Sequence, residues 1–299
     1  MALNKDRIED AFLRLMIGAV KRVPYRARVR IFGWLTGYVI APLAGFITKG
    51  VKNLQLIFPQ MPRAEARALA RRVAINFGKT TIENYSKEEL SEVLRHCRID
   101  GPGLADFKAA LAEGRGVMVV SGHLGNYETL RVAIHNMGYP VAALYRPAKN
   151  PYFNAHYKTT MESLTGPGFD QGRRGVMAFV RHVQKGGVAA MLFDVRATRY
   201  GDVEFFGHPA PTSPFPAEIS LKTGALLLPV FCHRCEDGIH HEVHFETPIA
   251  HSTAAEMTRE MTRRLEAQVR RFPDQWLWIH DRWGTEKQRA QRAARSKEA

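Results

Sequence analysis

The stretch from Gly116 to Glu128, GVMVVSGHLGNYE, decides the fold. Its first half is a short apolar run that ends at a glycine, which is typical of a strand buried within a sheet. Its second half is a turn that leads into a helical pattern at Asn126, a residue type that favours helix starts. The turn therefore places His123 at the carboxyl end of a strand, where ligands bind in open α/β sheets.

Strand and helix patterns alternate along the rest of the chain. The predicted strands are 116–122, 141–147 and 188–194, and a hairpin that turns at 236–238 is predicted within 225–249. The predicted helices are 62–86, 103–116, 126–138, 150–163, 175–187 and 253–273. This alternation predicts an α/β fold with a mainly parallel central sheet flanked by helices.

The composition is that of a globular, strongly basic chain. Its 299 residues are 45% hydrophobic, and 43 Lys and Arg against 29 Asp and Glu give a formal charge of +14. Such an excess of positive charge favours an anionic partner, such as a membrane surface, an acidic protein or nucleic acid. Three cysteines are too few for a disulfide scaffold and indicate a reducing compartment.

The N-terminal part is apolar between basic flanks. Residues 31–48 contain no charged side chain, five basic residues precede them within 21–30, and Lys49 and Lys52 follow. Eighteen residues are at the short limit for a membrane span. We expect a helical segment that lies in the membrane interface, with a single span or a buried core helix as alternatives. The expected divisions are a membrane-associated segment at 1–48, a main domain at 49–285 and a basic tail at 286–299.

The residues after the first strand carry the candidate chemistry. Glu128 falls in the first helical turn, so we expect the turn to bring the His123 ring towards its carboxylate. A carboxylate on one ring nitrogen fixes the tautomer and leaves the other nitrogen as a base for a hydroxyl proton. No serine or cysteine is placed as a nucleophile beside it, which favours direct transfer without a covalent intermediate. A surface or capping histidine is the alternative interpretation.

The GHLGNYE stretch resembles the H-x4-D/E motif of glycerolipid acyltransferases, and most closely that of the lipid A biosynthesis lauroyl/myristoyl acyltransferases. Further segments resemble that family in order across roughly 50–285: YRPAKNP (145–151), GRRG (172–175), GDVEFFGHPAPT (201–212), TGALLLPV (223–230) and QWLWIHDRW (275–283). The resemblance implies O-acyl transfer from an acyl thioester to a hydroxyl of a lipid acceptor. The implied donor is an acyl carrier protein or acyl-CoA, and the first acceptor is a lipid A precursor.

The resemblance also implies roles for individual residues. His123 would be the general base and Glu128 its orienting partner. The other implied site residues are Gly125, Asn126, Arg146, Arg173, Arg174, Asp194, Phe205, Phe206, Gly207 and Thr212. Arg146 and one of the paired arginines would bind phosphate, and Asp194 would hold one of these arginines. Backbone N–H groups near Gly125 are candidates for oxyanion stabilisation. The two phenylalanines are expected either at the site mouth or in the core.

Two departures from the family pattern leave the acceptor open. Asp194 lies between Phe193 and Val195, where the family commonly has Pro-Asp-Gln, and Tyr127 replaces a frequent Trp. Other lyso-lipids, including lyso-ornithine lipids and mannosylated phosphatidylinositols, therefore remain candidate acceptors. The implied location is the cytoplasmic face of the bacterial inner membrane, as a peripheral or single-span protein.

Other classes of site receive less support. Cys232 and Cys235 have the spacing of zinc ligands, but on one strand they point to opposite faces, so no metal or cofactor is expected. Nucleic acid is not an expected partner, because no recognition motif accompanies the basic charge. A basic membrane-surface or nucleic-acid-binding protein without catalysis is the non-enzyme alternative.

Overall fold

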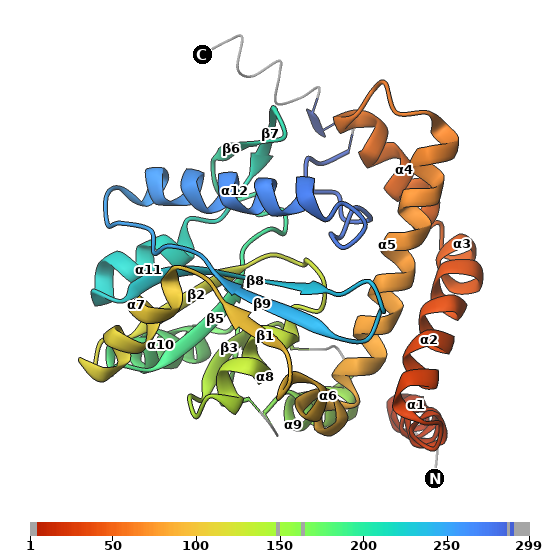
Figure 1. Cartoon of the computed structure of the whole chain (residues 1–299), viewed down its shortest axis with the longest axis horizontal. Coiled ribbons are helices and arrows are strands. Elements are labelled where there is room, and N and C mark those ends of the chain that lie inside the picture. Colours follow the sequence, from red (N-terminus) through yellow and green to blue (C-terminus); the bar gives the residue numbers. More distant parts are fainter. Residues whose placement is uncertain (1–4, 148–149, 163–164, 286–287, 290–299) are drawn as a thin grey trace.

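The computed structural model describes residues 5–147, 150–162, 165–285 and 288–289. Within these ranges the central sheet has seven strands in the order β1-β9-β8-β2-β5-β3-β4 (Figure 1). Strands β8, β2, β5, β3 and β4 run parallel, and β9 is antiparallel to β8 and parallel to β1. The sheet strands are β1 Arg98–Asp100, β2 Val117–Ser121, β3 Val141–Tyr145, β4 Gly168–Asp170, β5 Val188–Leu192, β8 Leu226–Arg234 and β9 His241–Phe245. A separate antiparallel ribbon contains β6 Asp202–Phe205 and β7 His208–Pro211.

Helices surround this sheet. Those before β2 are α1 Lys5–Lys21, α2 Tyr25–Leu35, the π-helical turn η1 Thr36–Ile40, α3 Ala41–Leu43, α4 Phe46–Ile57, α5 Arg63–Asn84, α6 Lys87–Leu94 and α7 Gly103–Ala112. Those after β2 are α8 Glu128–Asn136, α9 Pro151–Glu162, α10 Arg173–Gln184, α11 Phe215–Thr223 and α12 Ala254–Arg271. The predicted α/β architecture is confirmed. The strands β1, β4, β6 and β7 were not predicted from the sequence, because strands of three or four residues carry little periodicity. The short helices α6 and α11 were not predicted either.

Strand β2 is buried on both faces, as its continuous apolar run predicts. Val117 and Val119 point into one core with residues of α7 and α8. Met118 and Val120 point into the opposite core, with residues of α5, α10, α11 and α12. Each such side chain contributes about 1.5–3 kcal/mol by leaving water. Packing on both faces fixes the position of β2 within the sheet. It therefore also fixes the position of the turn that follows β2.

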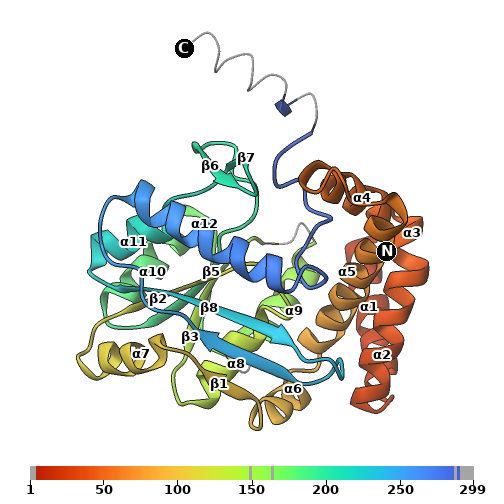
Figure 2. The same cartoon turned by 45° about the horizontal axis from the view of Figure 1, so that its top comes forward.

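The N-terminal segment packs closely on α5. A Cβ atom at Gly37 would lie 2.4 Å from the Ile75 side chain, and one at Gly78 would lie 2.3 Å from Thr36 Oγ1. Small residues at this contact allow the two backbones to approach. Figures 1 and 2 show α2 beside α5 at one end of the sheet. The apolar segment therefore has one face covered by protein.

The described helices can be compared with the thickness of a bilayer. Among them no single helix is long and apolar enough to cross it. The stretches Tyr25–Leu43 and Phe46–Ile57 meet the requirements of length and composition only together, and they are bent by 85° at their junction. The domain boundary expected at residue 48 falls inside α4. The expected basic tail lies outside the described residues except for 288 and 289.

Candidate active site

Adjacent parallel strands bring His123 and Asp194 together. Strands β2 and β5 are in register, with Ser121 opposite Leu192, and the Phe193 N–H donates to Ser121 O at 3.1 Å. The backbone leaves the sheet at its carboxyl edge after each of these two strands. His123, two residues beyond β2, therefore faces Asp194, two residues beyond β5. The location of His123 at the end of a central strand, predicted from the sequence, is confirmed.

Asp194 is the carboxylate partner of His123. Asp194 Oδ1 lies 2.7 Å from His123 Nδ1, and Asp194 Oδ2 accepts the His123 backbone N–H at 2.7 Å. The Trp276 indole N–H donates to Oδ2 as well, at 2.9 Å. The Asp194 side chain is 2% exposed, whereas that of His123 is 22% exposed. The buried Asp194 carboxylate therefore accepts three hydrogen bonds, one of them from Nδ1 of the partly exposed His123 ring.

The pair shifts the protonation of both groups. Burial alone would lower the pKa of His123, but the charge and hydrogen bond of Asp194 outweigh it, and the pKa of the imidazole is raised. Burial would raise the pKa of Asp194, yet His123 and the Trp276 N–H lower it to about 2. Asp194 therefore remains ionised and holds a proton on Nδ1. Among the described residues His123 Nε2 has no hydrogen-bond partner, so it is available as a base.

The expected contact between His123 and Glu128 is wrong. The Glu128 carboxylate lies 2.9 Å from Arg131 Nη1 and 3.6 Å from Lys87 Nζ. Burial would raise the pKa of Glu128, but these two cations outweigh it and the pKa is lowered. Glu128 is the first residue of α8, so its side chain reaches Arg131 one turn along the helix. Its observed contacts fix the start of α8.

Gly125 and Asn126 form a tightly held turn. Gly125 has a φ of 58°, and a Cβ there would lie 2.5 Å from Cys232 O, so both conformation and space require glycine. The Asn126 side chain accepts the Glu128 N–H at 3.1 Å, and α8 begins two residues later than the sequence predicted. The Gly125 N–H donates to Gln275 O and that of His123 to Asp194. Neither N–H is available for an oxyanion in this geometry.

The three candidate phosphate-binding arginines lie at the same edge of the sheet. Arg146 directly follows β3, and Arg173 and Arg174 begin α10 just after β4. Because β2, β3 and β4 are parallel, their carboxyl ends meet at one edge. All three side chains are exposed. The expected bond from Asp194 to one of these arginines is wrong, since Asp194 binds His123 and Trp276. Phosphate binding stays a prediction.

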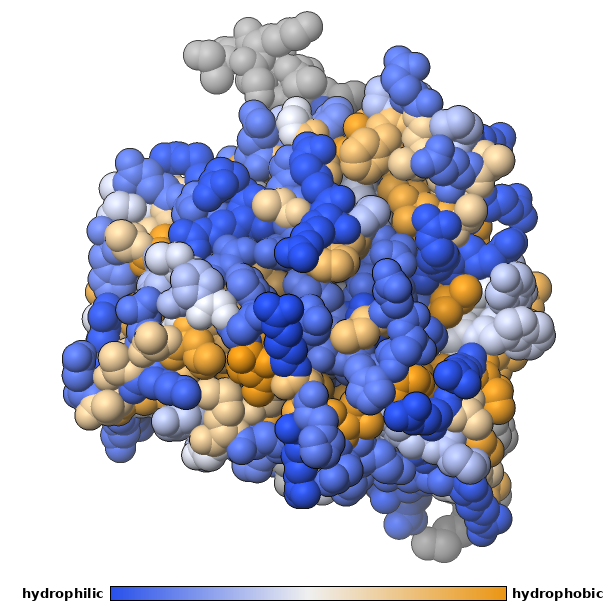
Figure 3. Space-filling model, in the orientation of Figure 1, coloured by the Kyte–Doolittle hydropathy of each residue, from blue (hydrophilic) through white to orange (hydrophobic). Residues whose placement is uncertain are grey.

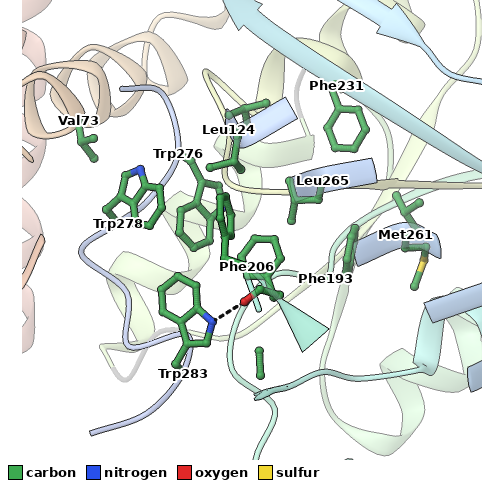
Figure 4. Packing of buried hydrophobic residues seen from close by; sticks show 14 of the residues in the cluster. Val73, Leu124, Phe193, Phe206, Phe231, Met261, Leu265, Trp276, Trp278 and Trp283 are labelled. Atoms are coloured by element: carbon green, nitrogen blue, oxygen red, sulfur yellow. Dashed lines mark hydrogen bonds between the residues drawn. The ribbon is translucent and has the colours of Figure 1, made fainter. Parts of the chain in front are cut away.

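The residues expected at the site mouth are mostly part of the core. Phe205 and Phe206 are 0% and 6% exposed and pack with three tryptophans of the 276–283 segment. Figure 4 shows Phe206 among these tryptophans, and the Trp283 indole donates to Phe205 O at 3.0 Å. The core alternative for the phenylalanines is therefore the observed one. Gly207, at φ 72°, completes the β6–β7 turn.

Thr212 is buried and serves as a link between segments. Its hydroxyl donates to Ala210 O at 2.8 Å and accepts from Arg282 Nη2 at 2.6 Å. Arg282 also donates to Pro211 O at 2.6 Å. These bonds tie the end of β7 to the C-terminal segment behind the aromatic cluster. Thr212 therefore contacts buried Arg282 and is not among the residues that line the pocket at His123.

A small, partly open pocket lies at His123. It is lined by Val73, Phe77, Thr80, His123, Gly125, Tyr127, Gln275, Trp276 and Leu277. The Tyr127 ring lies edge-on to the imidazole, with centroids 5.1 Å apart. No role for Trp276 or Gln275 was predicted from the sequence. The signal available was the cluster of aromatic and polar residues in QWLWIHDRW, which only long-range folding brings to the site.

The geometry defines an α/β protein with a carboxylate-paired histidine beside an open pocket, an arrangement suited to removing a proton from a bound group. Residues 8–285 match the bacterial lipid A biosynthesis acyltransferase family, and the chain belongs to it. The protein is therefore an acyltransferase.

Individual relatives are distant. The chain is 24% identical over 265 residues to the lipid A biosynthesis acyltransferase of Haemophilus influenzae, covering 86% of this chain and 81% of the relative. It is 26% identical over 240 residues to the lipid A biosynthesis palmitoleoyltransferase of Escherichia coli, covering 78% and 77%. It is also similar to a phosphatidylinositol mannoside acyltransferase of Mycobacterium tuberculosis, at 24% identity over 195 residues, or 64% and 62% of the two chains.

Proposed function

We propose that this protein transfers a fatty acyl chain from an acyl thioester to a hydroxyl of a lipid acceptor, with His123 as general base and Asp194 as its orienting partner. The observation that carries the proposal is the 2.7 Å contact between His123 Nδ1 and Asp194 Oδ1. It fixes the proton on Nδ1 and leaves Nε2 as the base, on a residue that lines the pocket. Glu128, the partner expected from the sequence, holds the start of α8 in this account.

The proposed reaction is a single acyl transfer. Nε2 of His123 takes the proton of the acceptor hydroxyl while its oxygen attacks the thioester carbonyl carbon. The new ester bond forms as the carbon–sulfur bond breaks, and the leaving thiolate takes the proton back from the imidazolium. Asp194 stabilises the positive charge on the ring during this step. General-base catalysis of this kind contributes roughly 10²- to 10⁴-fold to the rate.

The proposed acceptor is a lipid A precursor, with an acyl carrier protein as the preferred donor. Support for the acceptor comes from the family and from the names of the relatives. An acidic carrier protein or acyl-CoA is favoured by the net charge of +14. A mannosylated phosphatidylinositol or another lyso-lipid is the second candidate acceptor, favoured by the mycobacterial similarity.

We also propose that α2–α4 attaches the protein to the cytoplasmic face of the inner membrane. The uncovered side of this segment exposes the large apolar residues Ile31, Trp34, Tyr38, Val39, Ile40, Leu43 and Phe46. In Figure 3 hydrophobic side chains gather at the upper right, over the region of α4. Arg26, Arg30 and Lys52 are exposed beside them and suit anionic lipid. With its other side packed on α5, the segment would lie in one leaflet.

The function is tested with purified protein in mixed micelles containing labelled acyl-carrier protein or acyl-CoA and one acceptor at a time. Wild-type protein is expected to form an acylated lipid A precursor, and H123A to be slower by about 10²- to 10⁴-fold. H240A is the matched control, because the His240 side chain is 43% exposed on the β8–β9 turn and pairs with Asp237 rather than Asp194. Activity of H123A equal to that of H240A would refute the mechanism. Transfer only to another lyso-lipid would select the second acceptor.

A further inference from the structure

A fully buried ion pair lies behind the pocket. Both Glu83 oxygens bind the Arg234 guanidinium, Oε1 through Nη1 and Oε2 through Nη2 at 2.6 Å. The two side chains are 0% and 2% exposed. Burial would raise the pKa of Glu83, but Arg234 and His241 outweigh it and lower it to about 2, so the carboxylate stays charged. This pair joins helix α5 to the end of strand β8.

Two connections join the pair to the turn after His123, one direct and one through Thr80. Asn126 Nδ2 donates to Glu83 Oε2 at 2.9 Å. Arg234 Nη2 lies 3.5 Å from the Thr80 hydroxyl, which itself donates to Gly125 O at 3.2 Å. The ion pair therefore anchors the Asn126 side chain directly and the Gly125 carbonyl through Thr80.

A third connection runs through the C-terminal segment. The Arg234 N–H donates to Gln275 Oε1 at 2.7 Å, and Gln275 Nε2 donates to Arg234 O at 2.9 Å. Gln275 O then accepts the Gly125 N–H at 2.9 Å. The neighbouring Trp276 is the residue that binds Asp194. The segment that steadies the Asp194 carboxylate is thus itself fixed to the backbone of Arg234.

The network and the pocket share residues. Thr80, Gly125 and Gln275 all line the pocket at His123, and each is hydrogen-bonded within this network. Buried charged pairs of this kind hold one geometry rigidly, because any other arrangement leaves a charge unpaired in the interior. The pair does not touch the imidazole, so it acts only through the residues it holds.

We infer that Glu83 and Arg234 are a positioning pair that sets the His123 turn and the facing wall of the pocket for acyl transfer. This inference rests on the proposed function for its kinetic readout. It predicts that loss of the pair lowers kcat per folded molecule without moving the pH dependence, because the His123–Asp194 contact remains.

The test compares three variants with wild type: E83Q, R234M and the double apolar variant E83L/R234M. Each single variant leaves a buried polar group without its partner and is expected to lower Tm. The double variant removes both charges and is expected to recover most of that Tm, as buried ion pairs can often be replaced by apolar pairs. It still lacks the bonds to Asn126 and Thr80. We therefore expect its kcat to stay 10- to 100-fold below wild type, with an unchanged pH midpoint.

A second readout does not depend on activity. Amide hydrogen exchange is expected to rise in a peptide covering 121–128 in E83L/R234M, and to stay unchanged in one covering β5. E89Q is the matched control, because it breaks a different ion pair with a buried arginine, Arg28. It is expected to lower Tm and to leave kcat within about twofold of wild type.

The outcomes separate the two proposals. If E83L/R234M recovers both Tm and kcat, or if exchange in 121–128 does not change, the positioning role is wrong and the pair is structural only. If wild-type protein transfers no acyl chain to any acceptor, the proposed function fails. In that case faster exchange in 121–128 still supports control of the turn by the pair.

Discussion

The imidazole of His123 and the carboxylate of Asp194 meet across two adjacent parallel strands, 71 residues apart in sequence. The carboxylate five positions after His123 belongs instead to an ion pair with Arg131 and Lys87. In this chain the two acidic groups thus have different tasks, one at the histidine and one at the start of α8. The difference yields predictions that distinguish the two carboxylates.

Replacing Glu128 by Gln is expected to affect stability more than chemistry. The change leaves two largely buried cations without their carboxylate, which costs about 3 kcal/mol of unfolding free energy. Denaturant unfolding measures this loss. At a temperature where E128Q is folded, the pH midpoint of its acyl transfer should match wild type. A shifted midpoint would show that Glu128 acts on His123.

Replacing Trp276 by Phe removes one donor from the Asp194 carboxylate. Hydrogen bonds to a charged group contribute about 1.5–3 kcal/mol, and the ring stays in its aromatic cluster. We expect the pKa of Asp194 to rise and kcat to fall about tenfold. Steady-state kinetics measures the change in kcat, and denaturant unfolding measures the free energy lost with the hydrogen bond. W278F is the control, since the Trp278 indole donates to Pro273 O and not to Asp194. Equal kcat in both variants would argue against a role for the Trp276 donor.

Replacing Gly122 by Ala is expected to disturb the histidine–aspartate pair. The new methyl group would lie 2.6 Å from a Leu265 methyl carbon and 3.0 Å from Asp194 Oδ2. Overpacking of this kind costs about 1–3 kcal/mol, and kcat should fall at least about tenfold. G201A is the matched control, because a Cβ there meets no atom within 4 Å. Unchanged kinetics of G122A would contradict the requirement for close packing here.

Replacing Leu43 by Asp tests the membrane-facing segment. Leu43 is 85% exposed, so the change should leave Tm nearly unchanged. A leucine side chain buried in the membrane contributes about 2 kcal/mol to binding. Without it, partition onto anionic vesicles should fall more than about tenfold. Vesicle flotation measures the bound fraction. M177D is the control, since Met177 is 54% exposed on α10. Equal binding by L43D and M177D would exclude this segment as the attachment site.

The sequence predicted the parts of the fold that depend on local pattern. The apolar run at 116–120 identified β2, and the alternation around it identified the parallel sheet and the β8–β9 hairpin. The same pattern placed His123 at the sheet edge. Its carboxylate partner was not predictable from spacing, because Asp194 reaches His123 only through the β2–β5 register. The Trp276–Asp194 contact, 82 residues apart in sequence, and the Glu83–Arg234 pair, 151 residues apart, likewise depend on the tertiary fold.

The pH dependence of acyl transfer by wild type and D194N is the most direct test of the central claim that Asp194 supports His123 as the base. Transfer requires neutral His123, and the raised pKa of the imidazole places the wild-type midpoint above the ordinary value of 6.5, with activity lost as pH falls below it. In D194N only burial remains to shift this pKa, and burial lowers it. We predict a midpoint at lower pH and a maximal rate reduced at least about 100-fold. An unchanged midpoint with near-normal rate in D194N would contradict the account.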